Sequence, residues 1–145
     1  MKFLKSLEPL ALLALRLVLG LIFLVHGYPK LVHPTEAMHS FFIAHGLPGY
    51  FLNVSAILEC FGSVLLVVGL FTRPAALLLA IEMTVAIWKV HSLNGILSVR
   101  DYEFPLSLAA GCFILATIGA GLVSADYLIL GENAKKRRTV KPSNP

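Results

Sequence analysis

Four long apolar runs, separated by short polar stretches, dominate the sequence. They cover about residues 9–28, 51–71, 74–91 and 104–123. Each run is close to the ~20 residues that an α-helix needs to cross the hydrocarbon core of a bilayer. Pro9 and Pro74 stand near the starts of two runs, where a first helical turn tolerates proline. The pattern therefore predicts an all-α fold, an integral membrane four-helix bundle whose short connections make neighbouring spans antiparallel.

The connection between the first two runs carries a helical pattern of its own. In the stretch TEAMHSFFIAHGLP, Thr35 can cap a helix, while Gly46 and Pro48 can end it. The apolar residues 41–43 can lie in the membrane interface. We therefore expect a short amphipathic helix on the outer face, between spans one and two.

The composition supports a membrane protein, because 57% of the 145 residues are hydrophobic, only 14% are charged, and the mean hydropathy is +0.82. A soluble domain of this size would have to hide too much apolar surface. We expect a single membrane domain over residues 1–131, followed by a basic tail over residues 132–145. The run KKRR in this tail is too short, and too closely tethered to a bilayer, for a role in binding nucleic acid.

Lysine and arginine are distributed unevenly around the four runs. Lys2, Lys5, Arg73 and the KKRR run fall on one predicted side of the membrane. The positive-inside rule places this side in the cytoplasm. We therefore expect a multi-pass protein of which both termini are cytoplasmic.

Several ionisable residues fall inside the predicted spans, and Arg16, Glu59 and Glu82 lie deepest. Charge is costly there and usually faces the interior of the bundle. With a rise of ~1.5 Å per residue, Arg16 and Glu82 lie at similar depths from the cytoplasmic side, so we expect a structural ion pair between them. Glu59 enters its span from the opposite side of the membrane. By depth it belongs to an outer polar group that consists of His26, Lys89 and His91.

Helical phase adds a constraint to these depths. At ~100° per residue, Arg16, Gly20, Phe23 and Gly27 form one stripe of span one. Small residues beside a charge mark a close-packed face that points into the bundle. This stripe is therefore expected to be the inward face of the first span.

The same arithmetic applied to span three separates its polar residues. Glu82 and Lys89 are seven residues apart and share a face, whereas His91 lies roughly opposite Glu82 and needs a helix end or a kink to join them. Our hypothesis for Glu59 is a proton-exchanging or hydrogen-bonding group that faces a cavity open to the outer side.

The remaining chemistry-bearing residues match no known motif. The five histidines fall on the predicted outer side, but their spacing matches no compact metal motif such as H-E-x-x-H, and we expect no metal site. Cys60 and Cys112 lie within spans and belong to no C-x-x-C pair. We interpret them as buried free thiols.

A family resemblance rests on an ordered set of short stretches. These are LRLVLGLIFLVHGYPKL, FFIAHGLP, LECFGSVLLVVGLFTRPAALLLAIEMTVAIWKVH, NG, YEFPLSL and GAGLVSADYLI. In this order they resemble the DoxX family of small four-span bacterial membrane proteins, over roughly residues 12–130. Glu82 and Lys89 do not match the family pattern clearly, so Glu59 becomes an alternative partner for Arg16. Positions that do match include Arg16, His26, Lys30, Glu59, His91 and Glu103.

The resemblance implies a function next to redox enzymes in the bacterial inner membrane. The family includes a small membrane subunit of a thiosulfate:quinone oxidoreductase and a component of a membrane-associated oxidoreductase complex. By this resemblance the chain is a subunit of, or an anchor for, a quinone-linked oxidoreductase system with an intramembrane polar cavity. The alternative is a small-molecule transporter, or a membrane chaperone or adaptor, without redox activity.

The expected ligands and partners follow from the same resemblance. A quinone is the candidate cofactor. No covalent cofactor is expected, because the sequence holds no redox motif of its own. For the same reason the sequence leaves it undecided whether the protein is an enzyme. The expected partners are the lipid bilayer and a soluble or peripheral redox protein, and the Gly-rich helix ends suit a homo-oligomer as well as the bundle. The candidate cavity residues are Glu59, His26, Arg16, His91, Glu82, Lys89 and Glu103.

Overall fold

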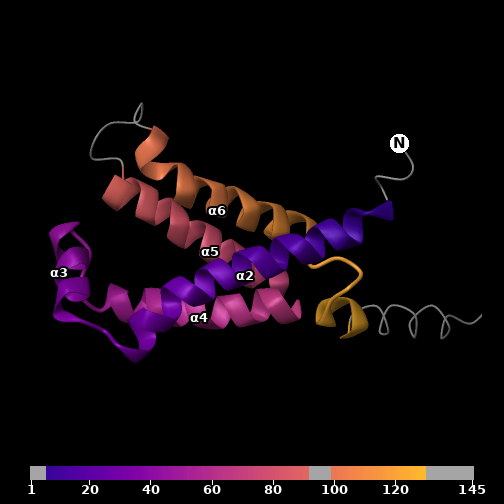
Figure 1. The fold of residues 1–145 in the computed structure, drawn as a ribbon, viewed down its shortest axis with the longest axis horizontal. Coiled ribbons are helices and arrows are strands. Elements are labelled where there is room, and N and C mark those ends of the chain that lie inside the picture. Colours follow the sequence, from indigo (N-terminus) through magenta and orange to yellow (C-terminus); the bar gives the residue numbers. More distant parts are fainter. Residues whose placement is uncertain (1–5, 92–98, 130–145) are drawn as a thin grey trace, which may run out of the picture.

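The computed structural model describes residues 6–91 and 99–129, and this part of the chain is helical, without strands. The helices, in chain order, are α2 (Glu8–Val32), α3 (Glu36–Ala44), α4 (Phe51–Val68), α5 (Thr72–Ala86) with the π-helical turn η1 (Ile87–His91), and α6 (Val99–Ile118) (Figure 1). The predicted all-α fold is confirmed. The expected basic tail at 132–145 lies outside the described residues.

Three of the described helices, α2, α4 and α6, are long and apolar enough to cross a membrane. Helix α5 has 15 residues, and η1 adds a five-residue π-helical turn to it. A fourth span therefore stays a prediction. The helix expected over residues 104–123 runs instead from Val99 to Ile118. The reason is that Gly119 and Gly121 adopt φ values of 97° and 78°, which are left-handed conformations that end a helix although the sequence stays apolar.

The short helix predicted between the first two spans is confirmed as α3. Thr35 is its N-cap, and the Thr35 hydroxyl oxygen accepts a hydrogen bond from the backbone N–H of Met38 at 3.3 Å. Such a bond satisfies one of the donors that the first turn of a helix leaves without a partner. The helix ends at Ala44, and Gly46, at a φ of 72°, turns the chain toward α4.

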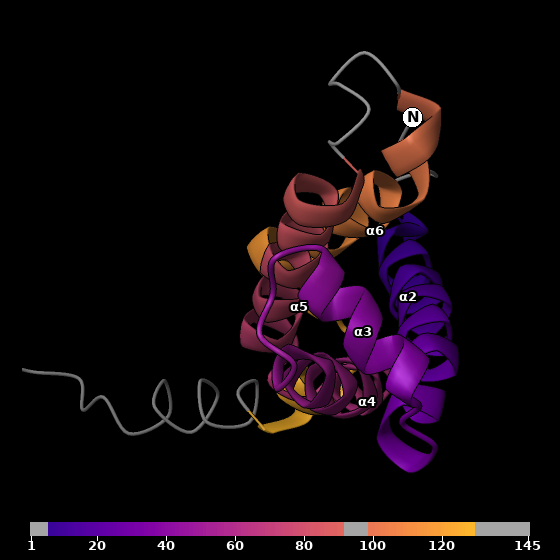
Figure 2. The ribbon, with the colours of Figure 1, turned by 90° about the vertical axis from the view of Figure 1, so that its left-hand side faces the viewer.

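The long helices form two closely packed pairs. Helix α2 packs mainly on α4, and α5 packs mainly on α6, while α4 and α5 join the pairs. Helix α3 lies across one end of the bundle, in front of the other helices when the molecule is seen from that end (Figures 1 and 2). We call this end the α3 end. The opposite end holds the reversal between α4 and α5 together with residues 119–129, and we call it the Asp126 end.

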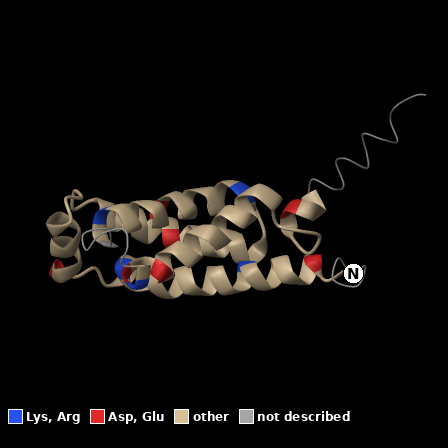
Figure 3. Ribbon diagram, turned by 90° about the horizontal axis from the view of Figure 1, so that it is seen from above, with Lys and Arg blue, Asp and Glu red and all other residues tan. Residues whose placement is uncertain are grey.

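The bundle is apolar on the outside and partly polar on the inside. Large hydrophobic side chains on the long helices, such as Leu21, Phe61 and Phe113, are 61%, 64% and 61% exposed. The buried side chains include Arg16, Ser55, Glu59, Ser63 and Thr72. Figure 3 shows that few charged residues interrupt the helical shafts. This distribution suits a lipid environment, in which apolar side chains face outward and polar ones are satisfied within the bundle.

Two glycines allow α2 and α4 to approach closely. A Cβ atom added at Gly20 would lie 2.6 Å from the side chain of Val67, and one added at Gly27 would lie 2.6 Å from the Cβ of Glu59. Real Cβ atoms do not tolerate such distances, so the contact requires glycine at both positions. The predicted inward stripe of span one is therefore a helix–helix contact, and it brings the backbone of α2 against Glu59.

Candidate functional site

A polar network connects three helices at the α3 end. The ammonium group of Lys30, from α2, lies 2.8 Å from both carboxylate oxygens of Glu59, from α4. It also donates to the hydroxyl of Ser55 at 3.2 Å, and this hydroxyl in turn donates to Oε1 of Glu82, from α5, at 2.6 Å. The ammonium group of Lys30 and the hydroxyl group of Ser55 thus link the carboxylates of Glu59 and Glu82.

The helical repeat explains why these side chains meet. Lys30 follows Gly27 by three residues and so continues the stripe of α2 that packs on α4. Ser55 and Glu59 are four residues apart and lie one turn from each other on α4. Because Gly27 has no side chain, α4 comes close enough for Lys30 to reach both residues. Glu59 is only 3% exposed, so an ammonium partner compensates most of the cost of burying its charge.

A cavity of about 890 Å³ adjoins this network. Helices α2, α3, α4 and α5 with η1 all contribute to its wall, and α3 forms part of the boundary at the end of the bundle. The wall is predominantly apolar and includes Phe41, Phe42, Phe51, Leu58 and Met83. The polar side chains on it are those of His26, Lys30, Thr35, His45, Ser55, Glu59 and Glu82.

Both histidines of the cavity are held by their own helices. Nδ1 of His26 lies 2.8 Å from the carbonyl oxygen of Ile22, and Nδ1 of His45 lies 2.7 Å from that of Phe41. A carbonyl oxygen can only accept, so each Nδ1 must carry the hydrogen. In the neutral ring, Nε2 is then an acceptor. The two imidazoles therefore have a defined tautomer when they are neutral.

Glu82 carries the least satisfied polar atom of the network. Its Oε1 accepts from Ser55, but its Oε2 is buried and has no hydrogen-bond partner among the described residues. Most buried polar atoms are paired, and each exception calls for an explanation such as a ligand or a water. The side chain lines the cavity, so a ligand that presents a hydrogen-bond donor is one such explanation.

Arg16 does not belong to this site. Its guanidinium group donates to the carbonyl oxygens of Leu66, Val67, Ala120 and Val123 at 2.8, 3.0, 2.8 and 2.6 Å. The predicted ion pair with Glu82 is therefore wrong, and so is the alternative with Glu59. Depth alone suggested a carboxylate, whereas the carbonyl groups at the end of α4 and in the turn after α6 satisfy the charge.

Three further candidates take other places. Lys89 lies over the ring of Trp88, with its nitrogen 4.7 Å from the ring centroid, and is not part of the cavity wall. The π-helical turn of η1 winds more slowly than an α-helix, so the seven-residue spacing from Glu82 no longer predicts a shared face. Glu103 is exposed on α6, away from the wall. His91 ends η1, and its side chain lies outside the described part of the structure.

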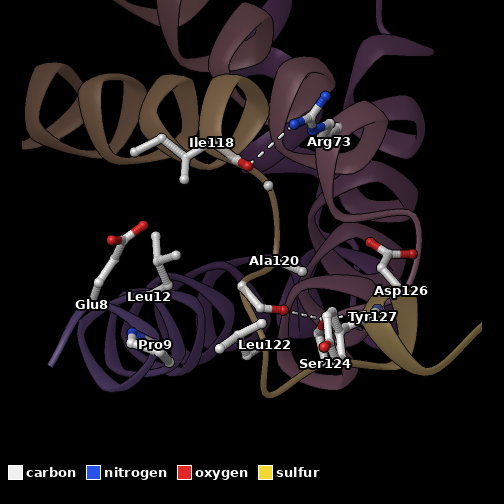
Figure 4. Close-up of a pocket in the computed structure, with 12 residues that line it drawn as sticks. Glu8, Pro9, Leu12, Arg73, Ile118, Ala120, Leu122, Ser124, Asp126 and Tyr127 are labelled. Carbon is white, nitrogen blue, oxygen red and sulfur yellow. Dashed lines mark hydrogen bonds between the residues drawn. The ribbon is translucent and has the colours of Figure 1, made fainter. Parts of the chain in front are cut away.

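A second cavity, of about 760 Å³, lies at the Asp126 end (Figure 4). Its wall includes Glu8, Arg73 and Asp126, and Arg73 donates to the carbonyl oxygen of Ile118 at 3.2 Å. Asp126 itself accepts from the backbone N–H groups of Phe71 and Thr72 at 2.8 and 2.9 Å. Asp126 is thus occupied in holding the chain reversal and Arg73 in a bond to the end of α6, which favours a structural role for these two residues.

Comparison with known sequences places the chain among its relatives. A family model described as DoxX matches residues 11–92, which is more than half of the chain. This chain belongs to the DoxX family. The "Putative oxidoreductase CatD" of Bacillus subtilis is 33% identical over 125 residues, which cover 86% of this chain and 90% of that protein. No solved structure matches the chain.

Two further relatives of this DoxX chain are membrane proteins by name. A membrane protein of Mycobacterium tuberculosis, Rv3486, is 30% identical over 131 residues, covering 81% of this chain and 80% of that protein. The inner membrane protein YqjF of Escherichia coli is 26% identical over 130 residues, covering 86% of this chain and 96% of that protein. Together with the three apolar helices, these relatives show that the chain is a membrane protein.

Part of the network of this DoxX chain is predictable from its sequence. The depth of Glu59 places it beside histidine or lysine groups at one end of the bundle, but depth indicates Lys89 and not Lys30 as the partner. The stripe of Gly20, Phe23 and Gly27 points to Lys30 when it is continued by one turn. Ser55 gave no signal of its own, because a serine in an apolar helix is common. The two cysteines are free and buried, as predicted.

Proposed function

We propose that this DoxX-family protein binds a quinone in the cavity at the α3 end and serves a redox partner as its membrane subunit or anchor. The observation that carries the proposal is one apolar cavity with a polar network on its wall. A quinone has a polar ring and an apolar tail, so it needs both kinds of surface within one site. A bound quinone would carry electrons and protons between the bilayer and the redox partner.

The dimensions and the chemistry of the cavity support the proposal. Small-molecule sites usually enclose ~300–1,000 Å³ and are lined by apolar side chains with a few polar groups that set the orientation, and about 890 Å³ falls in this range. Aromatic residues of α3, Phe41 and Phe42, offer stacking surfaces for a ring. Glu82 and His26 offer hydrogen-bonding atoms on the same wall.

The name of one relative also favours a redox role. This relative is the "Putative oxidoreductase CatD", and this chain aligns with 90% of it. The likeness supports a comparable role in a redox system, while the source of the electrons is a separate protein in our proposal. The chain's own residues would bind the ring, orient it and exchange protons with it.

The decisive experiment compares the quinone that copurifies with matched variants. Ala86 lies on the cavity wall, whereas Ala110 is exposed on α6 and does not, so Ala86→Phe should reduce the bound quinone and Ala110→Phe should leave it unchanged. The protein is extracted in mild detergent, and its lipids and quinones are quantified by mass spectrometry. We expect a near-stoichiometric quinone in the wild type and at least about a tenfold loss in Ala86→Phe, since a phenyl group occupies ligand space.

The opposite result is equally informative. If the wild type carries no more quinone than a membrane protein of similar size purified in parallel, the quinone proposal is overturned. Substrate flux into sealed vesicles that contain the protein alone would then identify the transporter alternative.

A further inference from the structure

Resting on the proposed function, we infer that the cavity selects the reduced form of its ligand, a quinol, over the oxidised quinone. The two forms have nearly the same shape and apolar surface. They differ in hydrogen bonding, because a quinol presents two O–H donors where a quinone presents two carbonyl acceptors. The choice therefore depends on which polar atoms of the wall are left unoccupied.

The strong donors on the wall are already engaged. An ammonium group has three N–H donors, and Lys30 makes three contacts, with the two oxygens of Glu59 and with Ser55. The hydroxyl hydrogen of Ser55 goes to Glu82. The Nδ1 hydrogens of His26 and His45 go to backbone carbonyls. A quinone carbonyl would have to displace one of these bonds in order to be bound.

The unoccupied polar atoms are mostly acceptors. They comprise Oε2 of Glu82, which lacks a partner among the described residues, and, in the neutral rings, Nε2 of His26 and of His45. The hydroxyl of Thr35 is exposed and accepts from Met38, so its hydrogen is the one side-chain donor that remains on the described wall. Acceptors therefore outnumber donors among the unoccupied side-chain atoms of the residues that line the cavity.

The net charge of the network also favours the quinol over the quinone. Two carboxylates share one ammonium, so the network has an excess of negative charge when both are ionised. A negative group next to the ligand favours an O–H donor and disfavours a carbonyl oxygen, which carries partial negative charge. A quinol hydroxyl can also donate to the buried Oε2 of Glu82, which a quinone cannot do. This adds to the preference for quinol, because an unpaired buried acceptor destabilises the complex with the quinone.

The test measures the affinities of both redox forms for the whole protein. Ubiquinol-1 and ubiquinone-1 are titrated anaerobically at pH 8 into nanodiscs that contain the protein, with empty nanodiscs as the blank. We expect the quinol to bind at least about tenfold more tightly, which corresponds to an increase of about 30 mV in the two-electron midpoint potential of the bound ligand.

A matched pair of variants tests whether the network causes the preference. Glu82→Gln keeps the shape and the acceptor for Ser55 but replaces the unpaired oxygen with an N–H donor. The ratio of quinol affinity to quinone affinity should therefore fall toward one. Glu8→Gln makes the same change at the Asp126 end and should keep the wild-type ratio. If the ratio of Glu82→Gln equals that of the wild type, the assignment of the preference to this network is wrong.

The outcomes separate this inference from the proposed function. Equal affinities, or tighter binding of the quinone by the wild type, overturn the selection of the reduced form and leave the quinone site standing. Binding of neither form above the empty nanodiscs overturns the quinone site itself, and the inference with it.

Discussion

Arg16 and Glu82 are both charged residues within apolar helices, yet they are satisfied in very different ways. Arg16 is 1% exposed and donates four hydrogen bonds to backbone carbonyls at the Asp126 end. Glu82 accepts one bond and keeps a buried oxygen without a described partner, beside a cavity at the α3 end. A charge that is bonded to several segments fixes a fold, whereas a partly paired charge next to a cavity is available to a ligand.

The first and largest test of this contrast is Arg16→Met. It removes the guanidinium donor from four carbonyl groups. The carbonyl oxygen of Leu66 keeps a bond from the backbone N–H of Gly69 at 3.2 Å, but unpaired buried acceptors cost about 1–3 kcal/mol each in mutational experiments. We expect a loss of at least about 3 kcal/mol of stability, seen as a large decrease in Tm in detergent. Arg73→Met removes a single bond of an exposed arginine and should change stability by less than about 0.5 kcal/mol. A stable Arg16→Met variant would show that the carbonyl contacts are dispensable.

The next test uses the two close contacts between α2 and α4. Gly20→Ala and Gly27→Ala each place a Cβ 2.6 Å from an atom of α4, and such overpacking typically costs about 1–3 kcal/mol. We expect similar decreases in Tm. Only Gly27→Ala should also weaken quinol binding, because the atom it displaces belongs to Glu59. Equal binding by both variants would contradict the link between this contact and the site.

A double-mutant cycle measures the Lys30–Glu59 pair itself. Lys30 is 23% exposed at its side chain and Glu59 is 4% exposed, so water screens the pair only in part. We expect a coupling free energy of about 1–2 kcal/mol between Lys30→Met and Glu59→Gln. The measurement is the Tm and the denaturation midpoint of the single and double variants. A coupling near zero would mean that water, rather than Lys30, compensates the charge of Glu59.

Among the substitutions in the polar network, the smallest stability effect is expected for Glu82→Gln. The amide keeps the bond from Ser55 and removes a charge whose second oxygen is unpaired, so the free energy of unfolding should change by less than about 1 kcal/mol and in the stabilising direction. Thermal unfolding in the same detergent provides the comparison with Arg16→Met. A decrease as large as that of Arg16→Met would make Glu82 a structural residue and remove the contrast between the two ends.

The sequence predicted the helices better than it predicted their contacts. Apolar runs and the Thr35 cap are local signals, so α2, α4 and the short helix α3 could be placed before the structure was known. The end of α6 could not, because an apolar run does not reveal that two glycines leave the helical conformation. The partners of Arg16 could not be predicted either, since backbone carbonyls leave no trace in a sequence. Lys30 could have been found, because it continues the stripe of Gly20 and Gly27.

The bonds of Arg16 also constrain the order in which the protein can be completed during synthesis. The carbonyl oxygens of Ala120 and Val123 lie 104 and 107 residues further along the chain. Asp126, which caps the start of α5, is made 54 residues after Thr72. The first hairpin therefore enters the membrane with an arginine that has two of its carbonyl partners, Leu66 and Val67, but not the other two. Contacts of long sequence separation form late in folding, so until the segment after α6 is in place this arginine depends on water or lipid headgroups for the remaining two hydrogen bonds.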